Sequence, residues 1–362
     1  MSSRSILLTA GAVNSGAVLS HVVSLAREME RRGHRVVVAS PGGPGARRLT
    51  HVPLCLRTPW DLARAVYRVR QLLERTCPDI VHAHGQLSAW VCQRARSGYP
   101  VAMAVTYHEE ESPGFHWKHL ARPGDLTIAT TEKVRHHLIR EFGFTGVQLI
   151  PAGIDTNLYA PGDQATAKRQ LELDEAMVVS AMGRWRGPEG SLVHCLIDAC
   201  DFLLDKWPGL QLLVAGDGSG RADIRVRAAR AKSRVILSGN VTGAATVFHA
   251  ADVVVATGRT ALEALSCSRP VLVAGRDGIV GPLTPASFSR LEQAGFSARG
   301  MGMPLDAGRI RDLLDFMLAR PGLGRQLGLH GRRLLEEKLS VSAVTGQLLE
   351  HYALTLSKRG AG

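Results

Sequence analysis

Hydrophobic residues gather in short continuous runs along this chain, and each run is followed by a longer stretch with apolar residues at helical spacing. The first run, Ile6–Ala10, predicts a buried strand, and the periodicity of Gly16–Arg32 predicts the helix after it. Gly33 stands where a left-handed helix cap belongs, and Val36–Ala39 begins the next strand. Short apolar strands between helices indicate a parallel sheet covered on both faces.

The same alternation continues along both halves of the chain. In the first half, the further strands expected are Ile80–His82, Val101–Thr106, Leu126–Ala129 and Val147–Ile150, and the helices are Trp60–Arg75, Leu87–Ser97 and Thr131–Gly143. In the second half, the expected strands are Val178–Met182, Leu212–Ala215, Val235–Leu237, Val253–Ala256 and Val271–Val273. The helices expected there are Ser191–Lys206, Ala222–Ala231, Gly243–Ala250, Gly258–Ser266, Ala307–Ala319, Gly322–Lys338 and Val341–Leu356.

Residues 151–175 interrupt this pattern and predict a linker between two domains. Pro151, Gly153, Pro161 and Gly162 fall close together there, and a polar helix-like stretch follows them. A length of 362 residues also fits about two domains. The domains expected are residues 1–160, residues 161–340 and a last helix, residues 341–362, that can return to the first domain. Ligands of such sheets bind beyond the carboxyl ends of the strands, so a cleft between the domains is the expected site.

Seven short motifs occur in order over roughly residues 11–273, each of them weak alone. They are Gly16–Val22 with Arg32-Gly33-His34, Asp79–Gly85, Val105–Glu109, Leu149–Asp155 with Tyr159 and Pro161, Gly183-Arg184, Gly216-Asp217-Gly218 with Arg221, and Leu262–Leu265 with Pro270-Val271. Together they resemble the retaining glycosyltransferases of the GT-B fold, in particular glycosyltransferase family 4. The resemblance implies an α/β protein of two Rossmann-like domains, the first binding an acceptor and the second a nucleotide sugar.

The resemblance also implies a nucleoside-diphosphate sugar as the donor substrate, with no metal and no other cofactor. The leaving diphosphate gains negative charge as the glycosidic bond breaks, and a fixed cation together with helix amides can hold that charge. Arg184 resembles the family arginine that grips the diphosphate. The amides are expected from Gly16, Ala17, Gly258, Arg259 and Thr260.

Three further positions complete the expected site. Glu263 resembles the family glutamate whose carboxylate accepts both ribose hydroxyls, and Gly216 belongs to the donor-binding Gly-Asp-Gly motif. His108 resembles the histidine that touches the donor sugar near the reacting carbon, where a neutral imidazole can accept a hydroxyl proton or relay charge. His108 and Arg184 are therefore the expected catalytic residues. His82 and His84 lack a third ligand at suitable spacing, so they are expected to pack rather than to bind metal.

The chain departs from the family pattern at two places. No lysine follows Arg184 at the usual spacing, and Arg186 is the nearest substitute, although a guanidinium fork differs from an ammonium point charge. Val255 stands where the family has its first glutamate, and the loop before Gly258 is short. A later series resembles an atypical bacterial branch of these transferases: Gly281, Thr284, Pro285, Phe288, Leu291, Phe296 and Arg299. An active enzyme of an atypical branch is therefore expected.

The charge balance indicates anionic partners. Lys and Arg number 44 against 32 Asp and Glu, which gives a net charge of +12. Arg57, Arg64, Arg68 and Arg75 lie on or beside one expected helix, which is either a solvated basic helix or a helix that lies on an anionic membrane. Six cysteines without paired spacing indicate reduced core residues, and no run of 18 apolar residues predicts a membrane-spanning helix. A cytoplasmic protein is expected, in peripheral contact with the inner face of the membrane if that helix binds lipid.

Three other functions remain open at this point. A nucleotide-sugar epimerase of the same architecture would need acid and base carboxylates, and Glu109, Glu110 and Glu111 form the only dense cluster of them. A non-catalytic partner of an active transferase would fit the missing lysine and Val255. A nucleic-acid binder is suggested by charge alone, and aromatic residues for base stacking make up only 5% of the chain.

Overall fold

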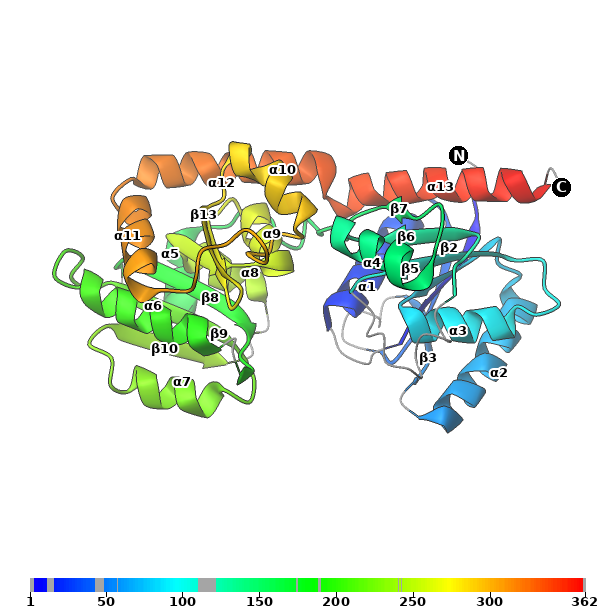
Figure 1. The fold of residues 1–362 in the computed structure, drawn as a ribbon, viewed down its shortest axis with the longest axis horizontal. Coiled ribbons are helices and arrows are strands. Elements are labelled where there is room, and N and C mark those ends of the chain that lie inside the picture. The colour runs from blue at the N-terminus through cyan, green and yellow to red at the C-terminus, as the bar shows by residue number, and fades with distance from the viewer. Residues whose placement is uncertain are drawn as a thin grey trace. The chain divides into compact units, whose positions relative to one another are not determined.

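The computed structural model divides the chain into two compact units, which are described separately (Figure 1). The first unit is Met1–Asp155 with Lys338–Gly362, and the second is Thr156–Glu337. The structure describes residues 3–11, 16–42, 49–56, 58–109, 122–173, 175–187, 190–239, 241 and 243–360. The chain leaves the first unit at Asp155, ahead of the expected boundary at residue 160, and re-enters it at Lys338.

The first unit is built on one parallel sheet of seven strands. These are β1 (Ser5–Ala10), β2 (Arg35–Ser40), β3 (Thr50–Pro53), β4 (Ile80–His84), β5 (Ala102–Tyr107), β6 (Leu126–Ala129) and β7 (Gln148–Leu149). Their order across the sheet is β3-β2-β1-β4-β5-β6-β7. All pairs are parallel, and the strands β1, β4, β5 and β6 are buried along their whole length.

Helices cover both faces of this first sheet. The helices are α1 (Gly16–Arg31), α2 (Pro59–Thr76), α3 (Gln86–Ala95), α4 (Glu132–Phe142) and α13 (Val341–Gly360). One core contains Val22 and Met29 of α1 together with Leu348 of α13. The core on the other face contains side chains of α2, α3 and α4, including Val69 and Leu138. The last helix thus completes the layer that α1 begins (Figure 1).

The second unit repeats this plan with six strands. These are β8 (Val178–Arg184), β9 (Gln211–Asp217), β10 (Arg234–Gly239), β11 (Val253–Ala256), β12 (Val271–Gly275) and β13 (Gly278–Pro282), in the order β10-β9-β8-β11-β12-β13. The helices are α5 (Gln164–Gln170), α6 (Gly190–Leu203), α7 (Arg221–Ala228), α8 (Ala244–Ala250), α9 (Gly258–Ser266), α10 (Pro285–Gln293), α11 (Ala307–Leu318) and α12 (Pro321–Lys338). Among the strand pairs of the described residues in this unit, β12 and β13 form the one antiparallel pair, and β13 is an edge strand. The expected α/β fold of two doubly wound sheets is confirmed.

Several elements differ from the expectation. The sequence pattern does not predict the edge strands β3 and β13, because they carry proline or glycine in place of an apolar run. Helix α10 was likewise not expected, and α5 lies within the stretch expected to be a linker. Cys55 and Cys77 are exposed, so the expectation that all six cysteines are core residues is wrong for these two. Among the described residues, none of the helices combines the length and apolar character needed to cross a membrane.

Candidate functional site

In both sheets the order of the strands reverses at one point. The reversal lies between β1 and β4 in the first sheet and between β8 and β11 in the second. At such a point the connections leave in opposite directions, and a crevice opens beyond the carboxyl ends of the two strands. Some of the residues predicted from sequence, Arg184 and Thr260 among them, lie at these carboxyl ends.

The second unit has a cavity of about 230 Å³ at the carboxyl ends of β8, β11 and β12. Its lining includes apolar side chains of the strands and polar or charged side chains at or after the strand ends. These are Arg184, Thr257, Thr260, Arg276 and Asp277. Arg184 and Thr260 were predicted for the donor site, and they line one cavity.

Glycines allow the backbone around Arg184 to pack closely. Gly216, at the end of β9, has φ +104°, and a Cβ atom there would overlap the carbonyl oxygen of Gly183. A Cβ atom on Gly218 would overlap the carbonyl of Trp185 in the same way. Trp185 itself is buried in the cavity wall, and its indole N–H donates to the Ala215 carbonyl oxygen at 3.0 Å. Gly216 thus lies behind the cavity wall, where it lets the ends of β8 and β9 meet.

Two charged residues of the cavity have no counterpart in the sequence prediction. Arg276 and Asp277 form the turn between β12 and β13. The Asp277 carboxylate lies 3.5 Å from Nε of Arg276 and 3.6 Å from Nε of Arg299. Arg186, the expected substitute for the missing lysine, is exposed and does not line the cavity. Arg276 is therefore the second guanidinium of this cavity.

The start of helix α9 is fixed by the segment that follows β13. Gly258 has φ +59°, and its N–H donates to the Phe296 carbonyl oxygen at 2.7 Å, so this amide already has an acceptor within the chain. Phe296 is buried and packs edge-on against Phe288 of α10, with 5.3 Å between ring centroids. The series from Gly281 to Arg299 thus positions both α9, through Phe296, and Asp277, through Arg299.

Glu263 lies one helical turn after Arg259 on α9. Its side chain is 10% exposed, and its carboxylate accepts a hydrogen bond from Nε of Arg259 at 2.9 Å. Burial raises the pKa of Glu263, and the neighbouring Arg259 lowers it by a smaller amount. Glu263 does not line the cavity, whereas Val255, in place of the family's first glutamate, contributes an apolar side chain to the wall.

The first unit brings four histidines together at the carboxyl ends of β4 and β5. His84 ends β4, His108 follows β5, and the two nitrogens Nδ1 of His84 and Nε2 of His108 lie 3.0 Å apart. The two rings are stacked, with 5.3 Å between centroids. His21 of α1 lies edge-on to both rings, and His82 lies against His84 with 4.2 Å between centroids.

Two of these histidines are neutral. Burial and, to a smaller extent, the nearby His108 lower the pKa of His82 to about 3. Burial and then the imidazoles of His82, His108 and His21 hold the pKa of His84 well below its usual range. Within the described part of the chain, no three His, Cys, Asp or Glu side chains are arranged to hold a metal ion.

Some predicted positions are described only in part. Helix α1 begins at Gly16, as expected, but the surroundings of Gly16 and of the Ala17 side chain are not described by the structure. Of the acidic cluster considered for an epimerase, Glu110 and Glu111 lie outside the described residues, and Glu109 is exposed.

Comparisons with known proteins agree with this architecture. Residues 18–158 match the family model of Glycosyltransferase Family 4, and residues 176–283 match that of Glycosyl transferases group 1. The D-inositol 3-phosphate glycosyltransferase of Kribbella flavida is 28% identical over 62% of this chain and 63% of its own length. The phosphatidyl-myo-inositol mannosyltransferase of Mycobacterium tuberculosis is 25% identical over 77% of this chain and 81% of its own. The chain thus spans less than two thirds of the first of these relatives.

Solved structures show the same fold. A glycosyltransferase from Rickettsia africae superposes with a TM-score of 0.76 at 16% identity, over 98% of this chain and 99% of that one. The Anabaena protein HepE, solved with UDP, gives a TM-score of 0.75 at 19% identity over 96% and 99% of the two chains. The two doubly wound units are those of the GT-B fold.

Proposed function

We propose that this chain, a GT-B protein of the glycosyltransferase family 4 type, transfers a sugar from a nucleoside diphosphate to an acceptor hydroxyl with retention of configuration. The observation that carries the proposal is the cavity at the strand-order reversal of the second unit, which two arginines line. A diphosphate needs fixed cations and helix amides, and this cavity supplies both at the start of α9.

The donor is held without a metal in this proposal. Arg184 and Arg276 take the diphosphate, and the amide of Thr260 at the start of α9 adds a donor where the charge of the leaving group grows. Arg276 takes the part that a lysine has in the family pattern. Glu263 accepts the ribose hydroxyls through the lone pairs that its hydrogen bonds with Arg259 and Tyr159 leave over.

His108 acts on the sugar in this proposal. It follows β5, the strand beside β4 and thus one strand away from the strand-order reversal of the first unit, and its ring contacts two other imidazoles. The acceptor is a glycan, a lipid or a small polyol that carries negative charge. The net charge of +12 supports this, as do relatives that are named for inositol 3-phosphate and phosphatidyl-inositol.

The test is to incubate the protein with a panel of nucleotide sugars and to measure the release of nucleoside diphosphate in the presence of a metal chelator. At least one donor should be turned over, and Arg184→Ala should abolish most of the release. Arg186→Ala is the matched control and should change the rate little, because Arg186 is exposed outside the cavity. A strict requirement for a divalent metal would contradict the proposal.

The role of His108 has its own experiment. His108→Ala should lower kcat by roughly 100-fold, the size expected when a group that stabilises charge or handles a proton is lost. The affinity for nucleoside diphosphate should change by less than about 1 kcal/mol, because the diphosphate is held in the second unit. Full activity in this variant would exclude His108 from the reaction.

We further propose that helix α2 rests on an anionic membrane surface. Val69 and Leu73 pack into the core, while Trp60 and Tyr67 are 79% and 64% exposed beside Arg64 on the outer face. Exposed amphipathic aromatics among arginines suit the boundary between lipid headgroups and water. Arg57 lies outside the described residues, and Arg68 and Arg75 are exposed as expected.

Vesicle sedimentation tests this contact. The protein should bind vesicles containing phosphatidylglycerol, fail to bind pure phosphatidylcholine, and dissociate as salt is added. Replacing Trp60 and Tyr67 by Ser should weaken binding at least tenfold. Phe202→Ser, which removes an aromatic side chain of similar exposure from the second unit, is the matched control and should bind normally. Equal binding by both variants would contradict a role of α2.

A further inference from the structure

The contact between His84 and His108 raises a question of proton placement. The two facing nitrogens, Nδ1 of His84 and Nε2 of His108, are 3.0 Å apart, so one of them must carry the hydrogen that the other accepts. The direction of this bond decides which nitrogen of His108 keeps the remaining proton. That nitrogen in turn decides whether His108 offers a donor or a lone pair to a sugar oxygen.

The surroundings of His84 distinguish the two arrangements. Its ring is buried, and its Nε2 atom has no hydrogen-bond partner among the described residues. If His108 were the donor, the proton of neutral His84 would sit on Nε2 as a buried N–H without an acceptor. If His84 is the donor, Nε2 is only a lone pair without a donor. Orphaned buried N–H groups are the rarer and costlier case, so the second arrangement is favoured.

His84 has little freedom to reverse this arrangement. His82 lies against one side of its ring, and His82 is itself held at both nitrogens. The hydroxyl of Tyr352 lies 2.6 Å from Nδ1 of His82, and the hydroxyl of Thr106 lies 2.7 Å from Nε2. Tyr352 belongs to α13 and is fully buried, so the last helix of the chain fixes the ring on which His84 rests.

We propose that His84 is a positioning residue that donates its Nδ1 hydrogen to Nε2 of His108. His108 then holds its own proton on Nδ1 and acts as a hydrogen-bond donor toward oxygen. This inference rests on the proposed function, because the oxygen would be a hydroxyl oxygen of the donor sugar. A sugar hydroxyl can accept this N–H, whereas a lone pair on the same nitrogen would require the hydroxyl to donate.

Nuclear magnetic resonance of the full-length protein, labelled with ¹⁵N-histidine, tests the inference directly. Two-bond proton–nitrogen spectra distinguish the two neutral forms of an imidazole, and His108→Ala assigns the signals. The wild-type protein should show His108 protonated on Nδ1. Protonation on Nε2 would overturn the inference without any variant, and this result does not depend on activity.

Three variants extend the test. His84→Phe keeps a ring but removes the donor, and it should move the proton of His108 to Nε2. His84→Asn places an amide N–H near the position of Nδ1 and should restore the Nδ1 form. His136→Phe, at an exposed histidine of α4, is the control and should leave the form of His108 unchanged. An unchanged His108 in a folded His84→Phe protein would overturn the inference.

Kinetics then link the proton to the reaction. With a donor identified, His84→Phe should lower kcat at least tenfold with little change in KM, and His84→Asn should recover most of the loss. Normal kcat in His84→Phe would overturn the positioning role. If no nucleotide sugar is turned over by the wild-type protein, the proposed function fails, while the spectra still decide where the proton of His108 lies.

Discussion

Four histidines among the described residues of the first unit are buried, namely His21, His34, His82 and His84. An imidazole in the core must remain neutral, because a buried charge without a partner is expensive. His82 meets this condition through the hydroxyls of Tyr352 and Thr106. The pairing also explains why a residue of the last helix lies beside the end of β4. The protonation of His82 is therefore linked to the stability of the first unit.

Acid should therefore destabilise the protein well above the pH range of its carboxylates. The pKa of His82 is about 3 in the folded chain and 6.5 when exposed, so the unfolded chain binds more protons between these values. Stability from this group is complete above pH 6.5 and is lost as the pH falls, by about 1.4 kcal/mol per unit. Urea unfolding should show a loss of about 2 kcal/mol from His82 alone between pH 6.5 and 5.

Two variants isolate this contribution. His82→Gln should be less stable than the wild type at pH 7, but the difference should shrink by about 2 kcal/mol at pH 5. His136→Gln removes an exposed histidine of α4 and should leave the slope unchanged. Parallel slopes in all three proteins would show that His82 is accessible to protons in the folded state.

The sequence predicts some of the residues that line the cavity of the second unit but not others. Arg184 and Thr260 were predicted from motifs, and both line the cavity. Arg276 and Asp277 were not, because they occupy a turn without a motif and reach the cavity only through the pairing of β12 with β13. The partner of Glu263 was not predicted either, although Arg259 stands at the helical spacing that allows the ion pair.

The second cation of the cavity can be identified by comparing two arginines. Arg276→Ala should weaken the binding of nucleoside diphosphate by about 1–3 kcal/mol, the usual cost of losing a charged hydrogen bond. Arg186→Ala should cost less than about 0.5 kcal/mol, as surface substitutions usually do. Isothermal titration calorimetry of both variants measures the difference. If Arg186→Ala weakened binding more than Arg276→Ala, Arg186 would replace the lysine of the family pattern, as the sequence alone suggested.

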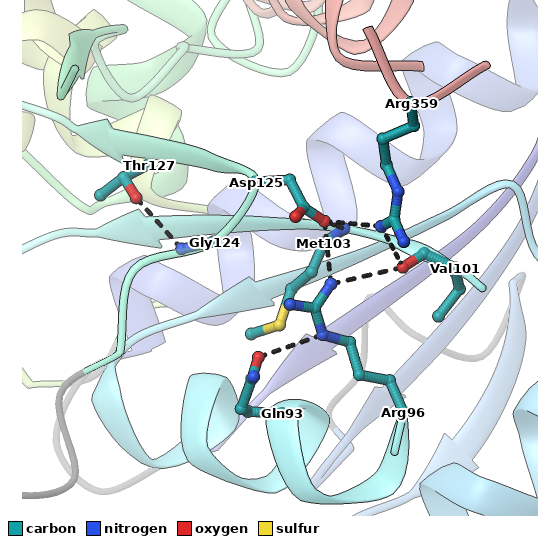
Figure 2. A network of polar contacts seen from close by, with 8 residues as sticks. All are labelled: Gln93, Arg96, Val101, Met103, Gly124, Asp125, Thr127 and Arg359. Carbon is teal, nitrogen blue, oxygen red and sulfur yellow. Dashed lines mark hydrogen bonds and ion pairs between the residues drawn. The ribbon is translucent and has the colours of Figure 1, made fainter. Parts of the chain in front are cut away.

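At the scale of elements, the end of helix α13 is attached to the first sheet through the carboxylate of Asp125. Asp125, just before β6, accepts hydrogen bonds at 2.8 Å from Arg96 after α3 and from Arg359 of α13 (Figure 2). The N–H of Met103 on β5 donates to the same oxygen at 2.8 Å. Both guanidinium groups also donate to the carbonyl oxygen of Val101 (Figure 2). The network joins helices from opposite faces of the first sheet at its amino-terminal edge.

Removing this carboxylate should loosen the end of α13. Asp125→Ala should lower the free energy of unfolding by about 1–3 kcal/mol, because two guanidinium groups and one amide lose their acceptor. Asp312→Ala breaks an exposed pair with Arg311 and should cost less than about 0.5 kcal/mol. Thermal unfolding compares the two. Equal, small shifts would mean that apolar packing of residues such as Leu348 alone holds the helix.

Helices and strands could be predicted where the signal lies within their own residues. The buried strands and long amphipathic helices have continuous apolar runs or helical spacing, and the structure contains them. The edge strands β3 and β13 depend on pairing with β2 and β12, which lie earlier in the chain, and their own residues carry little signal. Helix α10 combines a local signal with a tertiary one. Its capping box at Thr284 and Ser287 can be read from the sequence, whereas the burial of Phe288 depends on the fold of the second unit.

For the whole molecule, the two units share one plan and carry different chemistry. Each sheet reverses its strand order once, and each reversal is lined by residues of a distinct kind: neutral histidines in the first unit and arginines in the second. Neutral imidazoles suit contacts with sugar hydroxyls, whereas arginines suit a diphosphate. In the proposed function, the imidazoles therefore serve the sugar of the donor and the arginines serve its diphosphate.

Hydrogen exchange can distinguish the residues that contact the diphosphate from those that contact the sugar. A nucleoside diphosphate alone should slow amide exchange at the carboxyl ends of β8, β11 and β12 and at the start of α9, while β4 and β5 remain unchanged. The matching nucleotide sugar should protect the same segments and, in addition, the residues around His84 and His108, because only the sugar reaches them in the proposed function. A stable sugar phosphate without a nucleoside serves as the control and should protect neither edge strongly. If the diphosphate alone protected the ends of β4 and β5, the histidines would belong to the site that holds the diphosphate, and the division between the two sheets would be wrong.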